Sequence, residues 1–359
     1  MRTPFKKKSA ADLVGSSLGR MAWRRFRRNP LSLGSLIVIC LLALVALLGY
    51  LITPDHTPYC NQQYLELATL KPFSKAQFLC VATDGEHHIP NMLKGWPLDY
   101  TATPIIKYER ARDSIFATPY NGDPLAYAAS EATVEQRTFV LGTDAYGRDV
   151  LSLLMLGSRV SLSIGFIAIV IALLLGITLG ALAAYCGGWV DNLIMWIINV
   201  VWSIPTVLLV IAITFVLGKG FWQIFIAVGL TMWVDIARVV RGEVLGIKEK
   251  EYVEATRALG YGTFRTVFRH ILPNIAGAVV VVAASNFASA ILLEAGLSFL
   301  GIGVQPPMPS WGMMVKENYG YLLLDSAYLA LLPGAAIMVT VLAFMLLANG
   351  LRDALDVKR

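Results

Sequence analysis

Residues 251–274 read EYVEATRALGYGTFRTVFRHILPN and separate two long hydrophobic runs. Apolar side chains recur here at spacings of three and four residues, with charged side chains between them, which is the pattern of amphipathic helices. Gly260 and Gly262 interrupt the pattern, and Pro273 stands where the next hydrophobic run begins. The stretch therefore predicts two short amphipathic helices, joined at a glycine bend, at a membrane surface. The residues alone leave open whether this pair rests on lipid or meets another protein.

The composition places the chain in a membrane. Hydrophobic residues make up 56% of the sequence and charged residues 15%, whereas soluble domains carry about 25% charged residues. The formal net charge is +6, but the basic residues gather beside the hydrophobic runs, as they do on the cytoplasmic side of membrane proteins. We therefore expect membrane lipid and no nucleic acid as a partner. The four cysteines lack the spacing of a metal site.

The amino-terminal part predicts one spanning helix. Residues 1–30 form a basic segment that we expect in the cytoplasm, with an interfacial helix around residues 23–26. The apolar run over residues 31–52 is longer than the apolar core of a signal peptide, so we interpret it as the first transmembrane helix.

Residues 53–140 contain no run long enough to span a bilayer and are rich in prolines, aromatic and polar residues. If the amino terminus is cytoplasmic, this segment is an extracytoplasmic insertion. Cys60 and Cys80 form a disulfide there or remain free thiols, and the sequence decides neither. His87 and His88 are adjacent and lack further spaced ligands, so we interpret them as surface residues and expect no bound metal.

The rest of the chain, residues 141–359, predicts five more spans, over about 161–185, 193–217, 221–240, 275–293 and 328–347. Gly176 and Gly180 stand at the spacing that lets helices approach closely. Pro205 removes a backbone donor and should kink its helix. Asp235 and Arg238 are placed to pair on one helical face.

Several catalytic patterns are absent from the sequence. It contains no phosphate-binding GxxxxGK[ST] loop and no HExxH or GxSxG motif. We therefore expect no catalytic residue and no cofactor bound by this chain. Few ionisable residues fall within the predicted spans, which disfavours an intramembrane enzyme or an ion-coupled carrier.

The central stretch resembles a known motif. Glu254-Ala255-Thr256, then Gly260, then the HILP of residues 270–273 resemble the EAA loop in permease subunits of bacterial ABC importers, most closely the dipeptide/oligopeptide/nickel transport family. The resemblance extends to LGTDAYGRDV (141–150), EAGLSFLGIG (294–303) and NGLRDALD (349–356). Thr256, Leu153 and Asn349 depart from the family pattern, which has Ala, Arg and Asp there.

The resemblance implies an all-α integral membrane protein with six transmembrane helices, the type I ABC importer permease fold and both termini in the cytoplasm. It implies a permease core over residues 141–359 with a cytoplasmic coupling loop at 241–273. Implied partners are a homologous permease subunit, two cytoplasmic ATP-binding subunits that hold ATP and Mg²⁺, and an extracytoplasmic solute-binding protein. The residues we expect to couple to the ATPase are Glu251, Glu254, Ala255, Thr256, Arg257, Gly260 and Pro273.

The function that follows from the resemblance is that of a permease subunit in a bacterial inner membrane, for di- or oligopeptides. Import of nickel or of another small molecule is the alternative within the family. Outside the family, the alternatives are an exporter that shares the permease core and an ion-coupled carrier.

Overall fold

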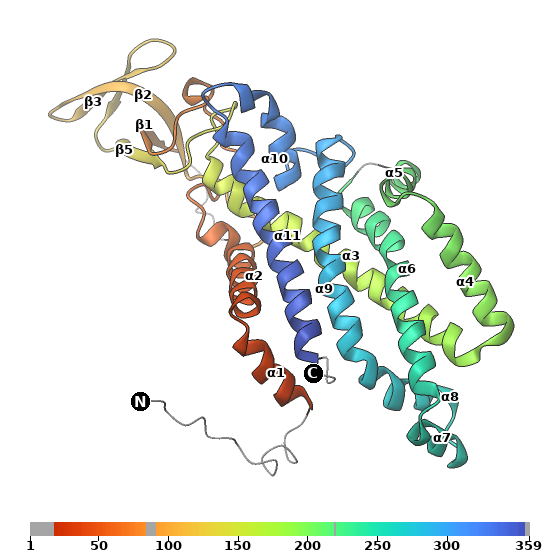
Figure 1. Ribbon diagram of the computed structural model, residues 1–359. Coiled ribbons are helices and arrows are strands. Elements are labelled where there is room, and N and C mark those ends of the chain that lie inside the picture. The colour runs from red at the N-terminus through yellow and green to blue at the C-terminus, as the bar shows by residue number, and fades with distance from the viewer. Residues whose placement is uncertain (1–17, 84–90, 219, 356–359) are drawn as a thin grey trace, which may run out of the picture.

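The computed structural model of the chain describes residues 18–83, 91–218 and 220–355, so the pair His87-His88 lies outside the described residues. Long helices form most of the molecule, and a small β-sheet stands at one end of the bundle (Figure 1). The helices are α1 (Leu18–Arg28), α2 (Pro30–Leu48), α3 (Val150–Cys186), α4 (Gly188–Ser203), α5 (Thr206–Leu217), α6 (Phe221–Lys248), α7 (Glu251–Ala258), α8 (Thr263–Thr266), α9 (Leu272–Phe299), α10 (Trp311–Asn318) and α11 (Tyr328–Leu355). The strands are β1 (Ser74–Ala82), β2 (Tyr100–Ala111), β3 (Ser114–Pro119), β4 (Leu125–Ala128) and β5 (Ala132–Phe139).

Five helical segments in the described part of the chain are long and apolar enough to cross a membrane, and α4 with α5 makes a sixth if the pair counts as one span. Helix α3 has 37 residues, so at about 1.5 Å per residue it is much longer than the roughly 30 Å hydrocarbon core of a bilayer. It starts at Val150, well before the span that we expected from about residue 161.

The pair α4–α5 corrects one expectation. We expected a single helix over about 193–217 with a kink at Pro205, but two separate helices meet there at an angle of 96°. Pro205 has no amide hydrogen to donate, and the residue before it, Ile204, is extended, with φ −92° and ψ 129°. The break is therefore much larger than the kink that a proline makes inside a continuous helix.

Helices α3 and α6 pack closely at two glycines of α3. A Cβ atom built on Gly176 would lie 2.6 Å from the Cβ of Ile236, and one built on Gly180 would lie 2.5 Å from the carbonyl oxygen of Ala237. Both neighbours belong to α6, and the second is a backbone atom that cannot rotate away. The absence of a side chain thus sets the distance between these two helices.

The insertion between α2 and α3 is a five-stranded sheet with the order β4-β3-β2-β1-β5, in which every described pair is antiparallel. The prediction of an all-α chain was therefore wrong for this segment, although the membrane part is helical. Alternate residues of the central strand β1 enter two different apolar clusters: Phe78 and Cys80 pack on one face and Leu79 on the other.

Backbone and side-chain hydrogen bonds fasten the sheet to the bundle. The Thr143 hydroxyl donates to the Leu67 carbonyl and accepts from the Leu70 amide at 2.8 Å. The phenol of Tyr328 on α11 donates to the Leu70 carbonyl at 2.6 Å. These contacts join segments that are far apart in the sequence, so the loop that leads into β1 is held to the segment before α3 and to α11.

A second anchor lies directly before α3. The guanidinium of Arg148 donates to Asp144 and to Glu317 of α10, each at 2.7 Å. Asp149 caps α3 by accepting from the Ser152 amide at 2.8 Å and from its hydroxyl at 2.6 Å. The motif that resembles the family's LGTDxxGRD stretch is therefore a buried structural junction between the insertion and two helices.

The amino-terminal helix α1 lies beside the carboxyl-terminal end of α11. Its Phe26 is 3% exposed, and a Cβ built on Gly350 of α11 would lie 3.4 Å from that ring. The basic residues of α1 lie mostly on its exposed side. Helix α1 therefore has one face on the bundle and one basic face.

Cys60 and Cys80 are free thiols that lie in different clusters, so the structure contains no disulfide between them. Cys60 donates from its Sγ to the Asp55 carbonyl at 3.0 Å. Burial raises the pKa of the Cys80 thiol to about 11, and burial also raises the pKa of Cys60.

We expect neither Cys60 nor Cys80 to react with iodoacetamide in the folded protein at about pH 8, because both thiols are buried and protonated. After unfolding in guanidinium without reductant, mass spectrometry should find both alkylated. Peptides that stay unlabelled until a reductant is added would show a disulfide and contradict the structure.

Gly180→Ala should lower the melting temperature of the detergent-purified protein. The added methyl group meets the Ala237 carbonyl of α6, and overpacking of this kind costs about 1–3 kcal/mol. Gly246→Ala is the matched control, because a Cβ there meets nothing within 4 Å and alanine favours the helix. Equal melting temperatures for the two variants would contradict the close α3–α6 packing.

Candidate functional site

The stretch between α6 and α9, residues 249–271, is called the connecting segment below. It holds α7, α8 and one stretch of π-helix, Val267–Ile271, and it lies at the end of the bundle opposite the sheet (Figure 1). Helix α7 follows α6 after a tight turn in which the Lys250 amide donates to the Ile247 carbonyl at 3.0 Å. Helix α8 continues through the π-helix into α9 without a break. The connecting segment is thus attached to a spanning helix at each end.

Gly260 ends α7 because of its backbone conformation. Its φ is +75°, in the left-handed region that side chains other than glycine rarely adopt. The following amide, that of Tyr261, donates to the Thr256 carbonyl at 3.0 Å, which is the hydrogen bond that closes a helix at a C-terminal glycine. The sequence predicted a glycine bend between the two helices, and this left-handed turn at Gly260 is that bend.

One face of the connecting segment is buried in the bundle. Val253 and Ile271 are 0% exposed and belong to the main apolar cluster of the helices. Thr256 of α7 lies 3.4 Å from Thr266 of α8, hydroxyl to hydroxyl, and both are buried. The side chain of Thr256, one of the residues expected to couple to the ATPase, therefore joins the two halves of the segment instead of facing outward.

The other face of the segment is apolar and exposed. The rings of Phe264 and Phe268 stack with centroids 4.2 Å apart, although both side chains are exposed, at 73% and 55%. Leu259 beside them is 71% exposed. The spacing of these residues predicts the apolar sides of amphipathic helices, but their exposure is not visible in the sequence. Large exposed apolar groups of this kind mark interaction surfaces.

The residues predicted to couple to an ATPase divide between the two faces. Thr256 is buried, and the side chain of Arg257 lies outside the described part of the structure. The others are exposed and lie on or beside the connecting segment: Glu251, Glu254, Ala255, Gly260 and Pro273. The exposed surface therefore combines acidic groups on α7 with the aromatic pair that begins in α8.

The passage from α8 to α9 is reinforced by side chains. The guanidinium of Arg265 lies 4.1 Å from the ring centroid of Tyr261, and that ring stacks on His270 at 5.9 Å. Pro273 supplies no amide hydrogen, and the side-chain amide of Asn274 donates to the His270 carbonyl at 2.6 Å. These contacts hold α8 in a fixed position relative to the start of α9.

Two ionic contacts tie α6 to α3 and α4 at the same end of the bundle. Arg241 donates to both oxygens of Asp191 at 2.6 and 2.7 Å, a two-pronged pair between α6 and α4. The ammonium group of Lys248 donates to the Ala184 and Tyr185 carbonyls at 3.0 and 2.9 Å, at the C-terminal end of α3. Sequence reasoning missed both contacts.

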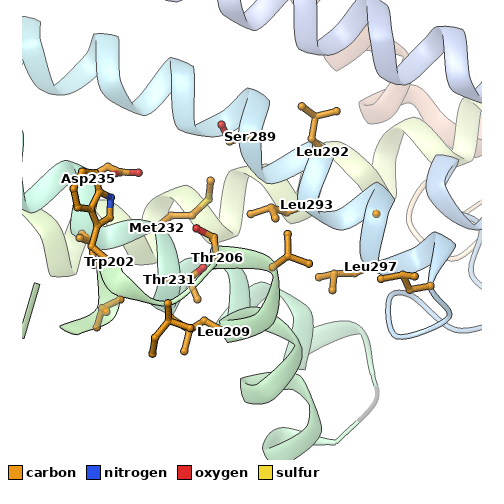
Figure 2. A pocket seen from close by; sticks show the side chains of 16 residues that line it. Trp202, Thr206, Leu209, Thr231, Met232, Asp235, Ser289, Leu292, Leu293 and Leu297 are labelled. Carbon is orange, nitrogen blue, oxygen red and sulfur yellow. The ribbon is translucent and has the colours of Figure 1, made fainter. Parts of the chain in front are cut away.

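A cavity of about 480 Å³ opens at the α4–α5 break, between α6 and α9 (Figure 2). We call it the α5–α6–α9 cavity. Its polar lining comes from Trp202, Thr206, Thr231, Asp235 and Ser289, and leucines of α9 line the other side. The wide break at Pro205 thus makes room for a cavity inside the helical part of the chain.

The contacts of two acidic residues, Asp235 and Glu294, are visible only in the structure. Asp235 makes no ion pair with Arg238 among the described residues; Arg238 lies over the ring of Trp202, 4.1 Å from its centroid. Glu294 is fully buried and accepts hydrogen bonds from the hydroxyls of Ser298 at 2.7 Å and Ser161 at 3.2 Å.

Two family models match the chain. One, described as "Binding-protein-dependent transport system inner membrane component", matches residues 176–359. The other, described as "N-terminal TM domain of oligopeptide transport permease C", matches residues 17–72. The first covers the connecting segment, the α5–α6–α9 cavity and all the spans after α3.

Curated relatives share about two fifths of the aligned residues. A glutathione transport system permease protein of Pectobacterium atrosepticum is 41% identical over 61% of this chain and 72% of its own length. An oligopeptide transport system permease protein of Bacillus subtilis is 41% identical over 60% of this chain and 71% of its own length. Among solved structures, an inward-facing methionine ABC transporter chain has a TM-score of 0.48 and 21% identity, over 58% of this chain and 97% of that one.

Proposed function

The chain belongs to the family of binding-protein-dependent transport system inner membrane components, and we propose that it is a permease subunit of an ATP-driven importer for di- or oligopeptides. Its helical core is the type I ABC permease fold of this family, and the protein is a multi-pass component of the inner membrane. The relatives named for dipeptide, oligopeptide and glutathione transport support peptides as the solute.

One observation carries the proposal: the connecting segment has a face built into the bundle and a face left open. Val253 and Ile271 are buried among the spanning helices, whereas Phe264 and Leu259 are exposed on the opposite side. A segment that only rested in solvent would gain nothing from exposing apolar side chains. We infer that an ATPase subunit covers the open face and that the buried face transmits its movement to α6 and α9.

The proposed assembly contains this chain, a homologous permease subunit and two cytoplasmic ATP-binding subunits. ATP and Mg²⁺ are held by the ATP-binding subunits, and this chain contributes no catalytic residue and holds no cofactor. The α5–α6–α9 cavity faces the homologous subunit, so the two permeases enclose the pathway together. Both termini lie in the cytoplasm, which places the basic helix α1 on the inner surface of the membrane.

Phe264→Asp should leave the protein in the membrane and reduce peptide uptake roughly tenfold or more, as loss of an apolar anchor does at other interfaces. The side chain is 73% exposed, so the change removes little from the fold of this chain. The measurements are ATP-driven uptake into proteoliposomes that contain the complete transporter and the amount of ATPase that co-purifies with this subunit.

Leu323→Asp is the matched control, because this leucine is 96% exposed and lies at the other end of the bundle, next to α11. It should keep both uptake and the bound ATPase. Normal uptake by the Phe264 variant would remove the connecting segment from the proposed coupling.

The sheet is the part of the chain that we propose to meet the extracytoplasmic solute-binding protein. It stands at the end of the bundle opposite the connecting segment (Figure 1), and its junction with α3 and α10 is held by the buried Arg148–Asp144 and Arg148–Glu317 ion pairs. Strands β2 and β3 present exposed aromatic side chains, Tyr108 and Phe116.

A photo-cross-linking residue in place of Phe116, which is 49% exposed on β3, should form a covalent adduct with the solute-binding protein upon illumination. The same residue in place of Met338, which is 64% exposed within α11, should form none. An adduct at neither position, in an assembly that imports peptide, would assign the contact to another part of the transporter.

A further inference from the structure

Asp235 is an ionisable residue in the middle of a membrane helix. Helix α6 runs over Phe221–Lys248 and is one of the segments long and apolar enough to span a bilayer. Ionisable residues on such helices face a cavity, a partner or a pathway. Helix α6 continues past the expected span to Lys248, and Asp235 lies about midway along the helix.

Asp235 also lies at the α5–α6–α9 cavity. Among the described residues that line this cavity, it is the one ionisable side chain. The cavity measures about 480 Å³, within the range of about 300–1,000 Å³ that is usual for small-molecule sites. Figure 2 shows Asp235 beside Trp202 at one side of the cavity and Leu292, Leu293 and Leu297 at the other.

The partners of Asp235 leave part of the carboxylate available. The side chain of Trp202 lies beside it in the cavity lining, and its indole has a single N–H to donate. A carboxylate has two oxygens and about four acceptor positions, so one indole N–H does not saturate it. The nearby cation, Arg238, lies over the Trp202 ring and is not in ion-pair contact with Asp235.

The cavity therefore has an anionic side and an apolar side. A small ligand that matches both carries an ammonium group and, next to it, an aliphatic or aromatic body. The free amino terminus of a peptide, together with its first apolar side chain, has this chemistry. A free carboxylate or phosphate would be repelled from this side by Asp235.

We propose that Asp235, beside Trp202, binds the amino-terminal ammonium group of the solute within the membrane part of this subunit. The leucines of α9 contact the neighbouring side chain. This inference rests on the proposed function, since it assigns the solute a position in the proposed pathway. It makes the permease itself selective for a free amino terminus, in addition to any selection by the solute-binding protein.

The test uses the assembled transporter in nanodiscs without the solute-binding protein, so that only the membrane part selects. Binding of Leu-Leu and of N-acetyl-Leu-Leu is measured by saturation-transfer NMR. The wild type should bind the free peptide about tenfold more tightly than the acetylated one, as expected for one charge-assisted hydrogen bond. Asp235→Asn should remove this preference.

Two variants serve as controls. Glu243→Gln makes the same chemical change on the same helix at an exposed position outside this cavity, and it should keep the preference. Asp235→Glu retains the charge, and it should restore the preference, which shows that loss in the Asn variant is not misfolding.

A preference that survives in Asp235→Asn, or a wild type that does not distinguish the two peptides, would overturn the inference. Uptake of Leu-Leu by the complete transporter with its binding protein is measured in parallel. Uptake without the binding preference would reject the role of Asp235 and leave the proposed function standing. No uptake of any peptide by the complete transporter would reject the proposed function itself.

Discussion

Each backbone amide and carbonyl inside the bilayer must find a hydrogen-bond partner within the protein, and most of this structure follows from that requirement. It explains why the spans are long helices and why a helix breaks only where its free backbone groups lie at a cavity or find another partner. The break before Pro205 lies at the α5–α6–α9 cavity. At the start of α9, the Asn274 side chain donates to the His270 carbonyl, close to the proline that donates nothing.

Charged side chains inside the protein also need partners within it. Arg148 pairs with both Asp144 and Glu317 at the junction below the sheet. Asp191 and Arg241 form a one-to-one pair at the opposite end of the bundle. Burying a charge without a partner is unfavourable, and these groups lie near helix ends with partners supplied by other elements. Asp235 differs from them because it makes no ion pair among the described residues, with Arg238 placed over the Trp202 ring instead, and this difference makes it a candidate binding group.

The sequence predicted the spans well because an apolar run of about 20 residues matches the thickness of a bilayer core. It could not give the angle at Pro205, since a proline permits a small kink as well as a complete break. It missed the sheet because the apolar residues of β1 come together as Phe78, Leu79 and Cys80, and the strand is packed on both faces, so it shows no clear alternation. It missed the Asp191–Arg241 pair because the two residues are 50 positions apart. In the connecting segment the residue types pointed to an interface, but which of them face outward depends on how α7 and α8 pack against α6 and α9.

The connecting segment is attached to α6 and α9, and these attachments can carry its movement to the α5–α6–α9 cavity. Helix α7 is attached to α6, which the pairs at Arg241 and Lys248 fasten to α4 and α3. Helix α8 is attached instead to α9 through the π-helix. The α5–α6–α9 cavity lies between α6 and α9, so a partner that turns α8 relative to α7 must change the separation of its walls. The joint between the two halves is the glycine-capped turn around Gly260, together with the contact of the Thr256 and Thr266 hydroxyls. A turn closed by the Tyr261–Thr256 hydrogen bond and held at one hydroxyl contact has fewer hydrogen bonds across it than a continuous helix, which is what a hinge between two rigid bodies requires.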